Sequence, residues 1–193
     1  ETAYPALPGL TAHRIKALAE VRTGEVLRAV VDEAPRRAAM RNHTATHLVH
    51  AALRNVLGTH VKQAGSVVEP GRLRFDFTHY AAVDAAELEE IERQVNQQVL
   101  RNAAVQTDLM EIEQALATGA MALFGEKYGE SVRVVSVPGF SRELCGGTHV
   151  ARTGDICGAV SGALMALSLK HAVTFASEEE KVKLYSLGRQ VID

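Results

Sequence analysis

Two histidines, His43 and His47, lie four residues apart in a segment whose apolar residues recur at helical spacing. On a helix this spacing places both imidazoles on one face, one turn apart, where they can bind a single metal ion. Thr44 stands where a zinc protease has its glutamate, which disfavours a protease. Solvated histidines also show this spacing, so the pair alone indicates only a candidate site.

A second pair, Cys145 and His149, is separated by two glycines and a threonine. Glycine adopts backbone conformations that other residues avoid, so this segment can bend a thiolate and an imidazole round one ion. The two pairs together offer three nitrogens and one sulfur, a set that suits zinc better than magnesium or calcium. We therefore expect one zinc ion per chain, bound by His43, His47, Cys145 and His149.

The remaining histidines and the second cysteine are not expected to bind the metal. His50 lies one turn beyond His47 and could replace a ligand, but we interpret it as a residue outside the ligand set. Cys157 is interpreted as a small buried apolar residue, with a Cys145–Cys157 disulfide as the alternative that a cytoplasmic setting disfavours. Four histidines have no partner pattern and are interpreted as surface residues: His13, His60, His79 and His171.

Composition excludes several functional classes. The 193 residues are 47% hydrophobic and 23% charged, which is typical of a globular protein. A net charge of -2 excludes a globally basic nucleic-acid binder, and 5% aromatic residues disfavour a base-stacking platform. No signal peptide is recognisable, and the longest apolar stretch, 156–169, is too short to span a membrane. We expect a soluble cytoplasmic protein with no membrane partner.

Hydrophobic periodicity and turn residues predict a mixture of helices and antiparallel strands, which is the α+β class. We expect a two-layer sandwich of antiparallel sheet and helices around the zinc site, with a partial N-terminal β segment. Asn42 is expected to cap the first helix, and Asp84 with Glu87 to form a capping box on the second. The expected elements are a hairpin over 21–31, helices over 43–56, 84–102, 112–118 and 177–191, strands over 61–68, 73–77, 105–110 and 131–137, and a loop over 140–155.

Three regions follow from this division of the chain. Residues 1–38 are expected to be a partial β segment or linker, 39–157 the zinc-dependent domain, and 158–193 a divergent segment ending in a helix. A small basic cluster, Arg36, Arg37 and Arg41, is expected just before the first helix, either as a contact for RNA phosphates or as a solvated basic turn.

Five segments closely resemble the editing domain of alanyl-tRNA synthetase, whose metal motif is shared by free-standing alanyl-tRNA editing proteins and by the threonyl-tRNA synthetase editing domain. The resemblance runs from about residue 30 to Ile156. It departs from the synthetase at both ends: no class II catalytic motifs precede it, and the sequence changes abruptly at Cys157. The segments are Arg41–Leu48 (RNHTATHL), Val61–Ser66 (VKQAGS), Leu73–Phe77 (LRFDF), Met121–Tyr128 (MALFGEKY) and Glu143–Val150 (ELCGGTHV).

The resemblance implies hydrolysis of Ser-tRNA(Ala) and Gly-tRNA(Ala), zinc as the cofactor, the acceptor end of tRNA(Ala) as the partner, and an ATP-dependent synthetase domain in the full-length protein. It implies that Thr46 and Gln63 line the pocket for the misattached amino acid. Thr46 has the alternative of bonding back into its helix, and Gln63 that of an outward strand residue. The rival functions are a structural zinc module that binds tRNA without catalysis, another metallohydrolase, and a metal-free domain.

The limits of amino-acid discrimination explain why an enzyme that charges tRNA with alanine would need such a hydrolytic activity. A pocket for alanine cannot strongly reject glycine or serine, because one methylene-sized difference gives only about 1–3 kcal/mol of discrimination. A second site that hydrogen-bonds the serine hydroxyl would leave a buried polar group unpaired when alanine is bound, at a cost of about 1–3 kcal/mol. That penalty would spare correctly charged tRNA.

Overall fold

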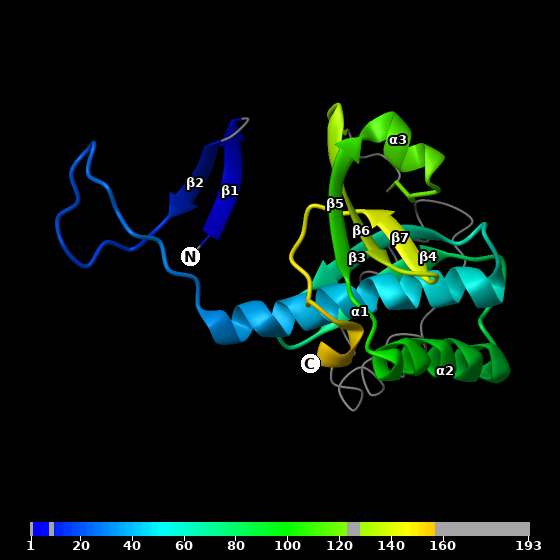
Figure 1. The fold of residues 1–193 in the computed structure, drawn as a ribbon. Helices are drawn as coiled ribbons and strands as arrows, with labels where there is room; N and C mark the ends of the chain where they lie inside the picture. Colours follow the sequence, from blue (N-terminus) through cyan, green and yellow to red (C-terminus); the bar gives the residue numbers. More distant parts are fainter. Residues whose placement is uncertain (1, 8–9, 123–127, 157–193) are drawn as a thin grey trace. The chain divides into compact units, whose positions relative to one another are not determined.

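A computed structural model of the chain describes residues 2–7, 10–122 and 128–156, and the structural statements below concern these residues (Figure 1). The chain divides into two compact units, Glu1–Val31 and Asp32–Asp193, which are considered separately. No helix among the described residues is both long enough and apolar enough to cross a membrane.

The first unit contains one antiparallel hairpin, formed by β1 (Thr2–Leu7) and β2 (Leu10–Arg14). The hairpin predicted over 21–31 is wrong. Its turn exists, with Gly24 at a φ of 85°, but the flanking residues do not pair as strands. Val26 and Val30 are exposed there, so strands in this segment would bury no apolar face in the unit.

The central element of the second unit is α1 (Glu33–Leu57), which begins ten residues earlier than the first predicted helix. Asp32 caps it by accepting a hydrogen bond from the Ala34 N–H, so the prediction of Asn42 as the cap is wrong. Pro35 is tolerated because an N–H in the first helical turn has no acceptor within the helix. The predicted basic cluster therefore lies within α1 and not in a turn before it.

Asn42 is instead buried in the helix, where its side chain donates to the carbonyl of Glu69 at 2.6 Å. That bond ties α1 to the turn between β3 (Lys62–Val68) and β4 (Leu73–Thr78), an antiparallel pair. Leu73, Phe75 and Phe77 alternate with more exposed residues and face the core, as their spacing predicted.

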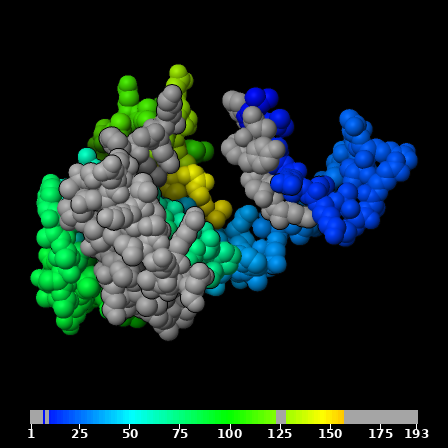
Figure 2. All heavy atoms as spheres, turned by 180° about the vertical axis from the view of Figure 1, so that it is seen from behind, coloured from blue at the N-terminus to red at the C-terminus, as the bar shows by residue number. Residues whose placement is uncertain are grey.

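The second long helix, α2 (Ala85–Arg101), packs against α1 and forms part of the outer surface of this unit (Figure 2). The predicted capping box is confirmed, since Asp84 accepts from the Glu87 N–H and the Glu87 side chain accepts from the Asp84 N–H. The main core lies between these helices and the β3–β4 pair, and includes Leu48, Leu53, Ile91 and Val95.

A three-stranded antiparallel sheet completes the unit, in the order β5 (Gln106–Glu111), β6 (Ser131–Val137) and β7 (Ser141–Leu144), with α3 (Ile112–Ala117) after β5 and a 3-10 turn at Thr153–Asp155. The prediction of a loop over 140–155 is wrong for β7. That strand buries the polar side chains of Ser141 and Glu143, so its hydropathy pattern did not indicate a strand.

These elements confirm the α+β class, with small antiparallel sheets in place of one continuous sheet. Helix α1 contacts β3, β4 and β7 as well as α2, so it connects both sheets of the second unit to its helical layer. The helix predicted over 177–191, together with Cys157 and His171, lies outside the described residues.

Candidate metal centre

Four side chains from two distant parts of the chain meet beside α1. His43 and His47 come from successive turns of that helix, whereas Cys145 and His149 come from the segment that follows β7. One nitrogen or sulfur atom from each residue lies within 4.8 Å of all the others, so the group can hold a metal ion. These are the four residues that the sequence predicted to share one ion.

The distances around the thiol match a tetrahedral site. Sγ of Cys145 lies 3.4 Å from Nε2 of His43 and 3.3 Å from Nε2 of His149. A tetrahedral zinc ion bound to one sulfur and one imidazole nitrogen separates those two atoms by about 3.6 Å. A small outward movement of these ligands would therefore accommodate the ion.

Glu143 holds the other ring nitrogen of His47. The Nδ1–H of His47 donates to Oε2 of Glu143 at 2.7 Å, and both side chains are buried. Nε2 of His47 is buried and has no hydrogen-bond partner within the part of the chain that the structure describes. A buried polar atom without a partner costs free energy, and a metal ion would satisfy it. The orphaned Nε2 therefore fits a metal-binding role.

Thr44 holds His149 in a similar way. Its hydroxyl donates to the carbonyl of Met40 at 3.0 Å, and the oxygen accepts from the Val150 N–H at 3.2 Å. Nδ1 of His149 lies 3.3 Å from that same oxygen. Because the hydroxyl proton is already donated, Nδ1 must be the donor, which leaves Nε2 of His149 free for an ion.

Hydrogen bonds from β6 hold the segment between Cys145 and His149 in place, and Gly147 lets that segment lie close to His43. The Cys145 N–H donates to the carbonyl of Arg133 at 2.9 Å, and the Arg133 guanidinium donates to the carbonyls of Cys145 and Gly147. A Cβ added to Gly147 would lie 2.5 Å from Nδ1 of His43, so only glycine allows this approach. The same addition at Gly146 would meet nothing within 4 Å.

Sequence reasoning assigned no function to Glu143, Thr44 or Arg133. The only available signal for Glu143 was its position two residues before Cys145, which in an extended segment places both side chains on one side. Thr44 was noted only for the glutamate that it replaces. Arg133 lies in a valine-rich strand, and nothing local connects it to the cysteine segment.

Without a metal, the centre favours a thiolate beside an imidazolium. Burial would raise the pKa of Cys145, but its hydrogen bonds with His149 and His43, together with the nearby His47, outweigh burial and lower the pKa to about 3. Burial would lower the pKa of His47, yet the nearby Cys145 sulfur and the bond to Glu143 raise the pKa to about 10. Burial is also the largest effect on His149 and lowers its pKa. The sulfur is thus already in the form that metals bind.

The other predicted site residues lie outside this cluster. Thr46 is buried and its hydroxyl donates to the carbonyl of Asn42 at 2.9 Å, while half-buried Gln63 donates to Oγ of Ser66 at 3.2 Å. The basic cluster is divided along α1: Arg36 and Arg37 are exposed and Arg41 is half-buried. Arg37 forms an exposed ion pair with Glu33.

Three further histidines have definite environments. His50 is only 4% exposed, and its Nδ1 lies 3.2 Å from Oε1 of Glu143, so it adjoins the centre without joining the ligand group. His60 and His79, interpreted as surface residues because the sequence showed no partner pattern, are half-buried and lie against each other. Nε2 of His60 lies 2.9 Å from Nδ1 of His79, and its ring stacks on Tyr80 at a centroid distance of 4.3 Å. The β3–β4 pair brings these residues together from 19 positions apart.

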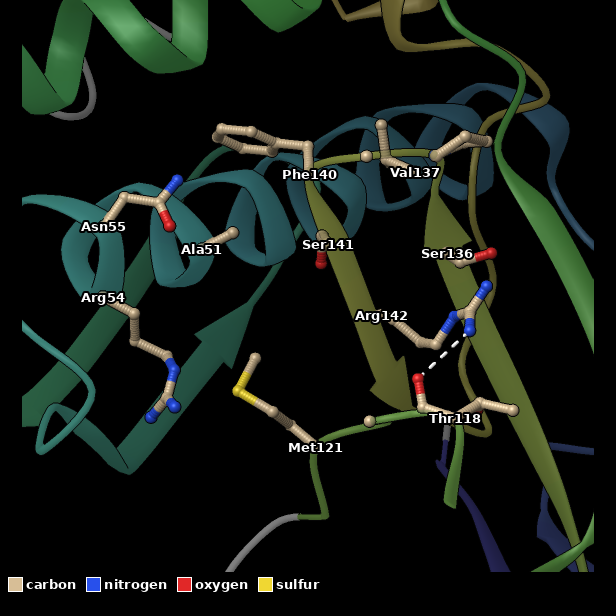
Figure 3. A pocket seen from close by; sticks show the side chains of 13 residues that line it. Ala51, Arg54, Asn55, Thr118, Met121, Ser136, Val137, Phe140, Ser141 and Arg142 are labelled. Atoms are coloured by element: carbon tan, nitrogen blue, oxygen red, sulfur yellow. Dashed lines mark hydrogen bonds between the residues drawn. The ribbon is translucent and has the colours of Figure 1, made fainter. Parts of the chain in front are cut away.

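A polar cleft of about 360 Å³ lies against α1 and the β6–β7 turn (Figure 3). None of the four candidate ligands lines it. Arg142 closes one side by donating to the carbonyl of Thr118 at 3.2 Å, and Ser141, also in the lining, donates to Oε1 of Glu143 at 3.3 Å. Among the described residues, the cleft is thus connected to the metal centre through Ser141, which bonds Glu143, and the chemistry indicated by the ligands lies elsewhere.

Comparison with known proteins adds independent information. The sequence profile of the "Threonyl and Alanyl tRNA synthetase second additional domain" matches residues 132–161, which include Cys145 and His149. The chain is 73% identical over 156 residues to the alanine–tRNA ligase of Solibacter usitatus, covering 81% of this chain and 18% of that protein. It is 53% identical over 156 residues to that of Fervidobacterium nodosum, with the same coverage, and 58% identical over 137 residues to that of Halorhodospira halophila, covering 71% of this chain and 16% of that protein. The chain therefore spans less than a fifth of the length of these curated relatives.

Proposed function

We propose that this chain, which corresponds to the editing-domain region of alanyl-tRNA synthetase as its motifs predicted, hydrolyses the aminoacyl ester of tRNA(Ala) mischarged with serine or glycine. One observation carries the proposal. The ligand atoms of His43, His47, Cys145 and His149 converge within 4.8 Å in a region shared with alanine–tRNA ligases. The proposed editing domain covers 39–157, with a partial β segment before it and a divergent segment after it.

Zinc is the proposed metal, at one ion per chain. Three imidazole nitrogens and one thiolate form a donor set that zinc commonly occupies, whereas magnesium and calcium require oxygen ligands. The unpartnered Nε2 of His47 and the lowered pKa of Cys145 support this assignment. When bound, zinc can polarise the ester carbonyl or lower the pKa of an attacking water.

Thr46 and Gln63 are the residues proposed to recognise the misattached amino acid. Thr46 lies on α1 between the two histidine ligands, and its hydroxyl proton is donated to Asn42, so its oxygen can act only as an acceptor. The hydroxyl of a serine substrate can donate to that oxygen, whereas alanine cannot. Among the described residues the Gln63 amide donates one hydrogen bond, to Oγ of Ser66 at 3.2 Å, so the amide can turn to a ligand at small cost.

The acceptor end of tRNA(Ala) is the proposed partner, and the full-length protein is proposed to carry a synthetase catalytic domain. Arg36, Arg37 and Arg41 present three positive charges along the first turns of α1, preceding His43 on the same helix. Phosphates of a single-stranded RNA end that reaches the metal centre would be attracted by them.

The test is hydrolysis of Ser-tRNA(Ala) and Ala-tRNA(Ala) by the intact chain, with and without a chelator, and by Cys145→Ala. We expect selective cleavage of Ser-tRNA(Ala) that both chelation and the substitution abolish. Thr46→Val should reduce the preference for Ser-tRNA(Ala) while leaving zinc bound. Equal cleavage of both tRNAs, or cleavage that survives chelation, would contradict the proposal.

A structural zinc module that binds tRNA without catalysis is the second candidate. It is favoured by the number of ligands, because four protein ligands complete a tetrahedral shell and leave no position for a substrate. Catalysis requires a fifth position or the release of one ligand. A chain that binds zinc one to one and protects Ser-tRNA(Ala) from hydrolysis would support this second function.

A further inference from the structure

We propose that Glu143 is the positioning residue of the metal centre, which fixes the tautomer and the orientation of His47. The inference rests on the proposed metal site but not on hydrolysis. Its evidence is the environment of the Glu143 carboxylate, which is only 2% exposed and lies in β7, two residues before Cys145.

A buried carboxylate is costly unless each oxygen finds partners, and here both oxygens do. Oε2 accepts from Nδ1–H of His47 at 2.7 Å. Oε1 accepts from the Ser141 hydroxyl at 3.3 Å and lies 3.2 Å from Nδ1 of His50.

The residues around the Glu143 carboxylate indicate its function. Ser141 donates to Oε1 and His50 lies beside that oxygen, so the direction of Oε2 is fixed, and the 2.7 Å bond from Oε2 orients the ring of His47. Nδ1 must carry the proton in this bond when Glu143 is ionised, because a carboxylate only accepts. Nε2 of a neutral His47 is then a bare lone pair, which is the form that binds a metal ion.

His50 itself is explained by this arrangement. It is buried on α1 one turn after His47, with its ring 5.1 Å from that of Phe75, and neither of its ring nitrogens has a hydrogen-bond partner among the described residues. Packing alone would favour an apolar side chain at such a position. Its only polar neighbour among the described contacts is Glu143, so its position next to the carboxylate gives it a function in holding that group.

The test measures zinc affinity by competition with a chromophoric chelator, using Glu143→Gln in the full chain. The amide keeps the shape but loses the charge, and it can donate to Nδ1 and so force the proton onto Nε2. We expect zinc affinity to fall by about 10- to 100-fold, the range typical of such outer partners. Glu143→Asp keeps the charge and should recover part of the loss. Asp76→Asn, a carboxylate-to-amide change elsewhere in the second unit, is the matched control and should bind zinc as the wild type does.

A measurement on the wild-type protein keeps the inference testable if the variants fail to fold. In the zinc-loaded chain, nitrogen-15 NMR of the imidazoles should show His47 with a protonated Nδ1 and a metal-bound Nε2. A metal-bound Nδ1 would overturn the inference, as would unchanged zinc affinity in a folded Glu143→Gln chain. Neither result depends on tRNA hydrolysis, so the proposed editing activity can fail while this inference holds, and the reverse.

Discussion

The substitution Gly147→Ala tests whether the cysteine segment is shaped for a metal ligand. Its new Cβ would lie 2.5 Å from Nδ1 of His43, whereas non-bonded carbon and nitrogen atoms need about 3.5 Å. Cε1 of the same ring would lie closer still, so the ring of His43 must move by more than about 1 Å. Metal–ligand distances tolerate only about 0.2 Å, so we expect the variant to lose His43 as a ligand.

The expected loss of zinc affinity is estimated by dividing the binding free energy equally among the four ligands. Structural zinc sites bind with apparent free energies of about 10–16 kcal/mol, so one ligand contributes about 2.5–4 kcal/mol, which corresponds to roughly 100- to 1,000-fold in affinity. Chelator competition measures this loss, and circular dichroism checks that the fold remains. Crowding in the metal-free chain should also lower its free energy of unfolding by about 1–3 kcal/mol.

Gly146→Ala is the matched control, because its Cβ would meet nothing within 4 Å. We expect that variant to bind zinc as the wild type does. The reasoning is refuted if Gly147→Ala retains wild-type zinc affinity, or if both alanine variants lose affinity to the same extent. The second outcome would point to general stiffening of the segment and not to contact with His43.

Three further predictions concern the same centre. Arg133→Ala should weaken zinc binding by about tenfold, since two carbonyls of the cysteine segment lose their donor, and chelator competition measures it with Arg142→Ala as control. Zinc removal should lower the melting temperature without abolishing the helical signal, because the main core contains none of the ligands. In the chelated protein, folding raises the pKa of His47 from 6.5 to about 10 and lowers the pKa of Cys145 from 9.0 to about 3. Between about pH 6.5 and 9, His47 therefore gains on folding the one proton that Cys145 loses. The free energy of unfolding, measured with urea, should be constant over that range. Stability should fall above pH 9, where only the folded chain keeps a proton on His47. It should also fall below pH 6.5, and more steeply below pH 4.5 as unfolding lets Glu143 bind a proton. A steady rise in stability from pH 6.5 to 9 would contradict this scheme.

The sequence predicted the amphipathic parts of the fold well, because those elements carry their own signals. The apolar stripe and capping box of α2 and the alternation of β4 around Phe75 were sufficient to place both elements. The start of α1 was missed because its first turns bury almost nothing, so no periodicity extends before residue 42. The actual cap, Asp32, is followed by Pro35, a residue that resembles a helix breaker unless the first turn is already known.

The ligand set was predictable because zinc requires few residue types at short spacings, and each pair is local in the sequence. The partners that orient the ligands were not predictable in this way. The bond between His47 and Glu143 joins residues 96 positions apart, and the contact between Thr44 and His149 joins residues 105 apart. Only the packing of β7 against α1 brings them together, and no local pattern encodes that packing.

The failures of sequence reasoning at this centre have one physical cause, which also supports a function for it. Helix α1 buries Thr44, His47 and His50 along a stretch where apolar side chains would pack at lower cost, and β7 buries Glu143 opposite them. Periodicity methods treat such polar residues as exposed, so β7, which carries Glu143, was expected to be a loop. A fold retains a costly buried network where its geometry is used, and here every member contacts a metal ligand or the carboxylate that holds one. Replacing the network by apolar residues should therefore leave stability unchanged or increase it while abolishing metal binding, and a loss of stability in the metal-free chain would show that the network is retained for stability.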